Sequence, residues 1–424
     1  MTTTELISEP VRITKMVHGG QALGELPDGK KVFVWNALPG ETVHVRIIKQ
    51  RRTYAEGIAE EIVVASPERI APKEVNYLAT SPWQMMTFAA ENKYKREIVT
   101  ELMQQQNVAA PKIGETVHDE HEYYYRNKME YSFWGDDDGL HLALHMRGSH
   151  GKQIVAGSAL AMPALDTAAE KVRSVLDGLH CRAGDLKTII VRCSQAGATV
   201  ASLFVKAQTF PTLELPTGLQ GLRVYHSNPK SPASVPTKLL QELGDCHLSD
   251  TLLGKPFTYD SDSFFQVNIP MFEHALQAIA DAVPTGELVD MYAGVGSIGL
   301  SVTKEKVELV ELDAATAAMA RVNAGAALVQ AEVIETAAEK SLEYIVADEP
   351  VVFDPPRAGL HDKVVDRVLE VQPPNAIYLS CNPATQARDL AKLQEAYDIT
   401  AMTAFNFFPR TPHIECLAIL KRKN

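Results

Sequence analysis

The sequence has few cysteines, and their spacing limits the sites they can build. Five occur in 424 residues, and no two of them form a Cys-x-x-Cys pair: Cys181, Cys193, Cys246, Cys381 and Cys416. This pattern argues against a disulfide framework and against a zinc site built on paired cysteines. We therefore expect no metal centre and a reducing, cytoplasmic location.

Long apolar runs are also missing. No stretch approaches the roughly 18 residues that a membrane-spanning helix needs. The opening MTTTELISEPVRITK contains no basic region followed by an apolar block, so nothing there predicts a secretory signal. We expect no membrane partner.

Positive charge is scarce as well. Acidic residues outnumber basic ones by 53 to 41, which gives a formal net charge of −12 at pH 7. This balance argues against a protein that coats nucleic acid without specificity. It does not exclude RNA, because phosphates respond to Lys and Arg within about 10 Å at ordinary salt. What remains is a folded protein, 46% hydrophobic, whose length predicts two or three domains.

Short strands separated by glycine turns occupy the N-terminal region. VRITKM, KKVFVW, TVHVRIIK and TYAEGIAEEIV alternate apolar and polar positions between the turns HGG, LPDGK and LPGE. The pattern predicts a small β-barrel of the oligonucleotide-binding kind over residues 1–66. One hairpin of this barrel is basic, and it is either an RNA contact or a solvated surface; its cations are Arg46, Lys49, Arg51 and Arg52.

The middle of the chain, residues 67–255, is mainly extended. A connection broken by prolines leads into a helical stretch at residues 87–107. From residue 111 onward the pattern favours strands, interrupted by one helix at residues 162–179. We expect a linker helix followed by a β-rich domain.

Residues 256–424 change to apolar strands that alternate with amphipathic helices. This alternation predicts an α/β domain with a doubly wound, largely parallel sheet, which ends in a β-hairpin. In such a sheet ligands bind at the carboxyl ends of the strands. Candidate functional residues should therefore follow strands directly.

A glycine turn follows the first strand of this domain. VDMYAGVGSIGL places Gly294, Gly296 and Gly299 in a G-x-G-x-x-G pattern, which lets backbone approach a bound nucleotide closely. Glu311, at the end of the next strand, is the candidate for two ribose hydroxyls, with Asp313 as second choice. Both nicotinamide dinucleotides and S-adenosylmethionine use this arrangement. Its C-terminal position in the chain favours a methyltransferase.

Two further strands end in reactive groups. In VVFDPPRAGL, Asp354 leaves its strand before two prolines that fix the backbone direction. In YLSCNPATQARDL, Cys381 ends its strand before two turn formers, Asn382 and Pro383, which indicates presentation rather than burial. Cys416, inside HIECLAIL, fits an ordinary buried cysteine better.

A thiolate at such an edge can attack an electron-poor carbon. Adding to C6 of a uracil makes C5 carbanion-like and able to take a methyl group. A base must then remove the C5 proton so that elimination frees the cysteine. Glu415 and His413, near the start of the last strand, are the candidates for this base, and Glu415 is preferred.

With these motifs in order, the sequence resembles the RNA 5-methyluridine (uracil-C5) methyltransferases. DMYAGVGSIGL, VFDPPRAGL, SCNPATQARDL and FPRTPHIE resemble the catalytic motifs of that family, SFFQVN its domain opening, and YRNKMEYSF its central RNA-binding domain. The N-terminal region resembles a TRAM domain. The resemblance implies a Rossmann-like class I methyltransferase domain, a Cys381 nucleophile and a Glu415 base. It also implies cofactor or uracil contacts from Gln266, Tyr292, Glu311 and Asp354.

The sequence departs from the family in two places. Many members carry cysteines before the first helix that hold an iron–sulfur cluster, whereas NYLATSPWQMM has none, so we expect no cluster. The family commonly has an Asp where this chain has Asn406, which puts the local support of the base in question.

We therefore expect an S-adenosylmethionine-dependent RNA uridine-C5 methyltransferase. A TRAM domain favours ribosomal RNA, in 23S rRNA, with transfer RNA as the alternative. Arg126 and Lys128 are expected to join the barrel cations in holding phosphates. Two rivals remain: a nicotinamide-dependent oxidoreductase, and a non-catalytic RNA-binding protein. The first leaves Cys381 and the barrel without a role, and the second is opposed by the presence of both nucleophile and base.

Overall fold

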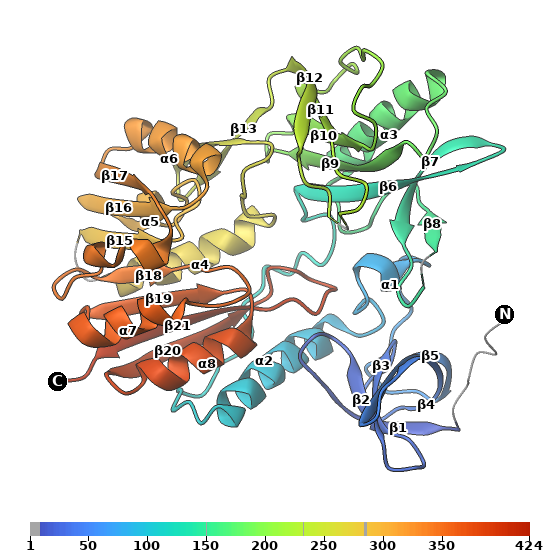
Figure 1. Cartoon of the computed structure of the whole chain (residues 1–424). Helices are drawn as coiled ribbons and strands as arrows, with labels where there is room; N and C mark the ends of the chain where they lie inside the picture. The colour runs from blue at the N-terminus through green and yellow to red at the C-terminus, as the bar shows by residue number, and fades with distance from the viewer. Residues whose placement is uncertain (1–8, 150, 232, 284–285) are drawn as a thin grey trace.

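The computed structural model of the chain describes residues 9–149, 151–231, 233–283 and 286–424. Residues 1–8, part of the segment in which we looked for a secretory signal, lie outside that description. Figure 1 shows three regions: a blue barrel, a green β-rich region and an orange-to-red α/β region. Within the described ranges, no helix combines the length and apolar character needed to cross a membrane.

The N-terminal region is a closed barrel with strand order β1-β2-β3-β5-β4. Alternate side chains of β1 point into the barrel, with Val11 and Ile13 buried and Arg12 exposed. This confirms the predicted barrel. The strands are β1 (Val11–Met16), β2 (Ala22–Glu25), β3 (Lys31–Trp35), β4 (Thr42–Gln50) and β5 (Tyr54–Val64).

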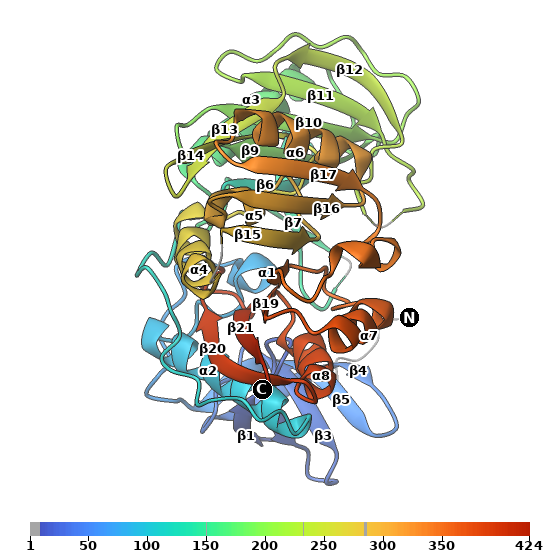
Figure 2. The ribbon, with the colours of Figure 1, turned by 90° about the vertical axis from the view of Figure 1, so that its left-hand side faces the viewer.

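A helical linker leaves the barrel and runs beneath the α/β region (Figures 1 and 2). It contains α1 (Tyr77–Thr80) and α2 (Phe88–Gln105), and Thr87 caps α2 by accepting a hydrogen bond from the backbone N–H of Ala90. The predicted linker helix is thus present. Its buried face carries charge, because Glu91 and Lys95 have no exposed side-chain surface.

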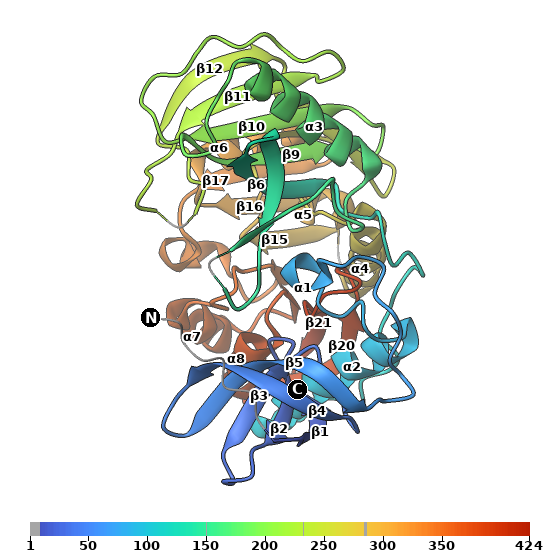
Figure 3. The same cartoon turned by 90° about the vertical axis from the view of Figure 1, so that its right-hand side faces the viewer.

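The central region is a seven-stranded sheet covered by one helix (Figure 3). A separate hairpin, β13–β14, follows it, and the predicted boundary between residues 255 and 256 falls inside that hairpin. The elements are β6 (Lys128–Asp136), β7 (Gly139–His145), β8 (Lys152–Ile154), α3 (Pro163–Gly178), β9 (Leu186–Cys193), β10 (Thr199–Val205), β11 (Gly221–His226), β12 (Lys238–Gly244), β13 (His247–Leu252) and β14 (Lys255–Asp260).

The C-terminal region is a seven-stranded sheet with order β17-β16-β15-β18-β19-β21-β20. The paired strands β17, β16, β15, β18 and β19 are parallel, and β21 runs antiparallel to both β19 and β20. The elements are α4 (Ile269–Ala282), β15 (Glu287–Met291), α5 (Gly299–Val302), β16 (Lys306–Glu311), α6 (Ala314–Ala326), β17 (Gln330–Glu335), the 3₁₀ turns η1 (Ala338–Lys340) and η2 (Leu342–Tyr344), β18 (Val351–Phe353), α7 (Asp362–Val371), β19 (Asn375–Ser380), α8 (Pro383–Leu393), β20 (Tyr397–Phe405) and β21 (Glu415–Arg422).

One part of the hydrophobic core extends across the boundaries between the regions. One continuous cluster includes Val43 of the barrel, Trp83 of the linker, Ile98 of α2 and Met291 of the C-terminal sheet. A second cluster lies on the other side of that sheet, and a third belongs to the central region. The barrel is therefore packed onto the C-terminal region through α2 rather than attached by a loose tether.

Candidate active site

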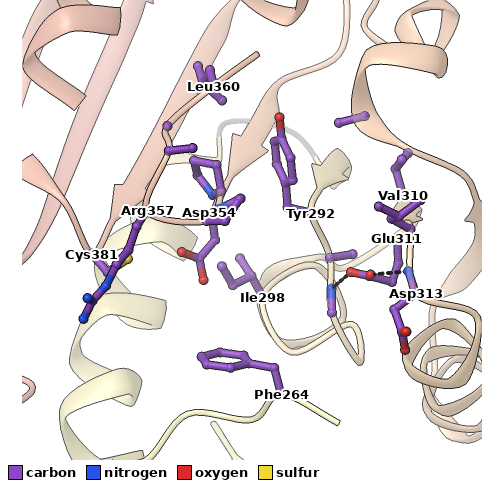
Figure 4. A pocket seen from close by; sticks show the side chains of 18 of the residues that line it. Phe264, Tyr292, Ile298, Val310, Glu311, Asp313, Asp354, Arg357, Leu360 and Cys381 are labelled. Atoms are coloured by element: carbon purple, nitrogen blue, oxygen red, sulfur yellow. Dashed lines mark hydrogen bonds between the residues drawn. The ribbon is translucent and has the colours of Figure 1, made fainter. Parts of the chain in front are cut away.

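A cavity of about 990 Å³ opens at the carboxyl edge of the C-terminal sheet. Figure 4 shows Glu311 and Asp313 on one side, Cys381 and Arg357 on the other, and Asp354 between them. The volume lies at the upper end of the range for small-molecule sites, enough for a nucleoside cofactor together with a second ligand. The topology accounts for this meeting of side chains, since parallel strands deliver their carboxyl ends to one edge.

The glycine turn after β15 is bent by left-handed backbone. Tyr292, Gly294 and Gly296 have φ values of 69°, 58° and 84°, a conformation that costs little only for glycine. Gly294 and Tyr292 line the cavity, but Gly296 does not. A Cβ on Gly296 would lie 2.7 Å from the Leu300 side chain, so its glycine is required by packing beneath the turn.

Glu311 is fixed at the end of β16 by two backbone donors. The N–H of Gly294 donates to its Oε2 at 2.9 Å, and the N–H of Asp313 donates to its Oε1 at 2.7 Å. Each carboxylate oxygen keeps a free lone pair beside the cavity. This is the geometry expected for accepting hydrogen bonds from the two hydroxyls of a ribose.

Two acids, the half-buried Asp354 and the fully buried Asp290, support the centre of the site. Burial raises the pKa of Asp354, which lines the cavity, to about 7, and that of Asp290, on β15, to about 8. The N–H of Gly299 donates to Asp290 Oδ2 at 2.7 Å, while Asp290 Oδ1 has no hydrogen-bond partner among the described residues. Asp290 therefore holds the glycine turn from below, a role that the sequence analysis did not assign.

Cys381 lies between the end of β19 and the first residue of α8. Asn382 is the N-cap of α8, with its side chain accepting from the N–H of Ala384, and Pro383 opens the helix. The thiol is half-buried, and burial, followed by the charges of Glu415 and Asp354, raises its pKa to about 11. The Arg357 guanidinium acts in the opposite direction.

Glu415 reaches the same edge because its strand runs the other way. In the antiparallel pairing of β19 with β21, Ser380 faces Cys416, and Cys381 and Glu415 are the residues next to this last pair. The charge of Glu415 acts on the Cys381 thiol, so the two side chains are near one another. Glu415 is buried and lines the cavity. Burial, followed by the charge of Asp354, raises the pKa of Glu415 well above its usual value, which makes it a stronger base than an ordinary carboxylate.

Two other cavity residues, Arg357 and Phe264, were not assigned by sequence, whereas His413 was the second candidate for the base. Arg357 Nη2 lies 3.4 Å from His413 Nδ1, and burial and neighbouring cations lower the pKa of His413 to about 4. His413 is therefore neutral at pH 7 and a weaker base than Glu415. Phe264 is 64% exposed and faces the cavity beneath Asp354 (Figure 4). The signal for Arg357 was present, since it follows the two prolines of VFDPPR.

The predicted RNA-binding cations Arg126 and Lys128 lie in different surroundings. Arg126 lines the cavity with Gln266, and its guanidinium lies 5.7 Å from the centre of the Phe408 ring. Burial, followed by the charge of Arg192, lowers the pKa of Lys128 to about 8.

In the barrel hairpin, two of the four cations are ion-paired. Arg46 pairs with Glu60 at 2.5 Å, and Lys49 pairs with Glu56 at 2.6 Å. Arg51 and Arg52 are exposed at the turn between β4 and β5. These two arginines are therefore the hairpin cations best placed to meet a phosphate.

The barrel reaches the site through its first turn. The main-chain oxygen of Gly20 accepts a hydrogen bond from Trp83 Nε1 at 2.9 Å, and a Cβ on Gly20 would lie 2.4 Å from Pro412. His18 hydrogen-bonds to the side chain of Asn382, the neighbour of Cys381. The first turn of the barrel thus lies beside Cys381.

Two segments of the chain match known families. Residues 251–423 match the model for the tRNA (Uracil-5-)-methyltransferase family, and residues 9–59 match that for the TRAM domain. The chain therefore contains a domain of the tRNA (uracil-5-)-methyltransferase family and a TRAM domain. The prediction from the motifs of an RNA methyltransferase with a TRAM barrel is thus confirmed.

Similar proteins extend over nearly the whole length. An uncharacterized RNA methyltransferase of Lactobacillus johnsonii is 29% identical over 97% of this chain and 98% of its own. One of Enterococcus faecalis is 28% identical over 97% of this chain and 96% of its own. The methyltransferase thus shares the full-length arrangement of these relatives.

A solved structure shares the fold. Pyrococcus abyssi tRNA (uracil-54, C5)-methyltransferase, in complex with S-adenosyl-L-homocysteine, superposes with a TM-score of 0.77. The match covers 97% of this chain and 100% of that one at 20% identity. The sheet also separates the methyltransferase from the nicotinamide rival, because β21 is an antiparallel strand inserted beside β19, whereas the dinucleotide fold has order 3-2-1-4-5-6.

Proposed function

We propose that the methyltransferase converts a uridine of RNA to 5-methyluridine through a covalent bond between Cys381 and C6 of the uracil. The observation that supports this proposal is that Cys381 and Glu415, the residues next to the last pair of β19 and β21, line one cavity with Glu311 and Asp354. Nucleophile, base and nucleoside-binding acid then share one cavity. The decisive test, trapping of the adduct, is described in the Discussion.

The residues present fit S-adenosylmethionine. Glu311 would accept hydrogen bonds from the ribose hydroxyls, Gly294 would let the backbone approach the nucleoside, and the exposed Leu312 would offer apolar surface beside them. Gln266, Tyr292 and Asp354 line the remainder of the cavity toward Cys381. When bound, this cofactor supplies an electrophilic methyl group.

Different residues of the chain carry out the successive steps of the reaction. Cys381 attacks C6 as a thiolate, with Arg357 stabilising its negative charge. After C5 has been methylated, Glu415 accepts the C5 proton, and the electrons of that C–H bond form the C5–C6 double bond as the bond to sulfur breaks. His413, neutral beside Arg357, is not needed as a base.

The target base must leave its stack before Cys381 can reach C6. Extruding a base costs a few kcal/mol, and least in a loop or an unpaired segment. Phe264 offers an exposed aromatic face inside the cavity, and stacking on such a face is worth about 1–3 kcal/mol per base. We propose that Phe264 stacks on the extruded uracil.

For the substrate we propose ribosomal RNA, in 23S rRNA, and a cytoplasmic location. The TRAM barrel beside the nucleophile supports an extended RNA strand as the substrate. Transfer RNA is the alternative, favoured by the family's description and by the activity named for the Pyrococcus enzyme. Incubating each purified RNA with methyl-labelled cofactor decides between them. Label in transfer RNA alone would reject the ribosomal assignment.

Replacing Glu311 with Ala should weaken cofactor binding by about 10²- to 10⁴-fold, because two charge-assisted hydrogen bonds of about 1.5–3 kcal/mol each are removed. Calorimetric titration with S-adenosylhomocysteine measures this. Glu339→Ala, at the same cavity but without the bonds to the glycine turn, is the matched control. Unchanged affinity in Glu311→Ala would remove Glu311 from the cofactor site.

Replacing Arg51 and Arg52 with Ala should weaken RNA binding more at low salt than at high salt. Each phosphate contact that is lost lowers the slope of log K against log salt by about 0.7 to 0.9. Filter binding over a range of potassium chloride concentrations measures the slope. Turnover of RNA that is already bound should be unchanged. A loss that does not depend on salt would exclude phosphate contacts for this pair.

A further inference from the structure

A buried charge cluster joins α2 to the loop between β20 and β21. Its members are fully buried or nearly so: Glu91 and Lys95 on α2, and Asn406 and Arg410 on the loop. Lys95 Nζ lies 3.0 Å from Glu91 Oε1, and Arg410 also contacts Glu122. Buried charges are costly unless they are paired and hydrogen-bonded, so their arrangement is tightly constrained.

Every polar contact of Glu91 outside its own helix goes to this loop. Its carboxylate accepts the backbone N–H of Arg410 at 3.0 Å and the Asn406 Nδ2 amide at 2.9 Å. Lys95 Nζ donates to Asn406 Oδ1 at 2.5 Å and to the main-chain oxygen of Phe408 at 3.1 Å. One turn of α2 therefore holds both ends of residues 406–410.

The loop conformation requires such partners. Arg410 has a φ of 65°, the left-handed region that a residue with a Cβ rarely adopts. Its guanidinium donates to the main-chain oxygen of Met86 at 2.6 Å, and its own main-chain oxygen accepts from the N–H of Trp83 at 3.1 Å. Glu91, bound to the N–H of this strained residue, fixes the loop at its tightest point.

The same loop carries the far wall of the catalytic cavity. Phe408 and His413 line that cavity, and Glu415 follows directly at the start of β21. A shift of the loop therefore moves the wall and the start of the strand that holds Glu415. The cluster itself lies outside the cavity lining and touches no reacting group.

We propose that Glu91 is a positioning residue for proton removal, holding the 406–410 loop so that Glu415 faces the C5 proton of the methylated intermediate. This inference rests on the proposed function. In this proposal α2, which lies outside the catalytic domain, controls proton removal and does not control the other steps of the reaction. Formation of the Cys381 adduct should depend little on Glu91, whereas resolution of the adduct should depend on it strongly.

Substitutions can move the carboxylate of this cluster from position 91 to position 406. Glu91→Gln removes the carboxylate next to Lys95, and Asn406→Asp places a second carboxylate 2.9 Å from the first. Each single change unbalances the buried charge. The double variant Glu91→Gln with Asn406→Asp again has one carboxylate beside Lys95, now at position 406. The amide at position 91 can donate a hydrogen bond to this carboxylate, so donor and acceptor have exchanged places. It should recover what each single variant loses.

The experiment measures two steps in one reaction. RNA with tritium at C5 of uridine reports proton removal as released tritium, and denaturing electrophoresis reports the adduct. We expect Glu91→Gln to slow tritium release by about 10²-fold, the scale of a misplacement of about 1 Å, with adduct accumulating. The double variant should release tritium at nearly the wild-type rate. Glu97→Gln, on the exposed face of α2, is the matched control.

Each outcome decides the inference. A lower melting temperature in Glu91→Gln with an unchanged ratio of adduct to product would leave Glu91 a purely structural residue and overturn it. So would a double variant no better than the single ones. If Glu91→Gln does not fold, Asn406→Ala, which leaves the Glu91–Lys95 pair intact, must show the same accumulation. Absence of a trapped adduct from the wild type on 5-fluorouridine RNA would reject the proposed function itself, a result distinct from either of these.

Discussion

Replacing Cys381 with Ala should abolish formation of 5-methyluridine, lowering turnover by more than about 10⁴-fold, the order seen when a catalytic nucleophile is removed. Without the thiolate, C5 of uracil is not carbanion-like and cannot accept the methyl group. Cofactor binding should stay unchanged, because Cys381 lies at the opposite end of the cavity from Glu311 (Figure 4).

Mass spectrometry with 5-fluorouridine RNA and S-adenosylmethionine tests this directly. Fluorine at C5 blocks proton removal, so the wild type should accumulate a covalent protein–RNA adduct and Cys381→Ala should form none. Cys181→Ala, a partly exposed cysteine of the central region, is the matched control and should behave as wild type. An adduct in Cys381→Ala, or its absence from the wild type with both ribosomal and transfer RNA, would contradict the mechanism.

Adduct formation should also speed up with rising pH. Burial raises the pKa of Cys381 to about 11 in the free enzyme, so the thiolate is a small fraction at pH 7. That fraction grows about tenfold per pH unit while the pH stays well below the pKa. Rapid-quench measurement of the adduct at limiting cofactor between pH 6.5 and 9 follows the rise.

Replacing Glu415 with Gln should have the second large effect, and of a different kind. The amide cannot accept the C5 proton, so turnover should fall by about 10²- to 10⁴-fold, the usual contribution of a general base. Cys381 remains able to attack, and the methylated intermediate should remain bonded to it. Glu415→Gln should therefore accumulate adduct on ordinary uridine RNA, which the wild type does not.

Denaturing electrophoresis of the variant with labelled RNA measures this trapped species. Glu395→Gln, an exposed carboxylate of the same domain, should leave no adduct and full turnover. Free product without adduct in Glu415→Gln would mean that another group removes the proton, with His413 the next candidate.

The sequence predicted most of the architecture because local patterns dominate it. Alternating apolar residues predicted the barrel, and helix periodicity placed α2 and α3 to within two residues of their ends. The strand before Asp354 is short, because only Val351–Phe353 pair with β15. Asn382 and Pro383 were interpreted as a turn, although they are an N-cap and a first-turn proline of helix α8.

The residues of the site were predictable where they follow strands. Cys381, Asp354 and Glu311 end strands of one sheet, so topology alone brings them together. The contacts that support them were not predictable, because they join distant segments. Asn406 donates a hydrogen bond to Glu91, which is 315 positions away in the sequence. The periodicity of neither segment predicts this contact. The acid expected at position 406 is thus supplied across the interface by α2.

The continuous core beneath the barrel and the C-terminal sheet has a consequence for how the enzyme loses its structure. A cut after residue 66 would expose apolar side chains on both pieces, because Val43, Trp83 and Met291 belong to one cluster. The barrel and the C-terminal domain should therefore melt together, in a single calorimetric transition, and neither should be transplantable alone. In this enzyme the RNA-binding barrel and the catalytic domain form one rigid unit. The distance between the bound RNA strand and the nucleophile is therefore fixed.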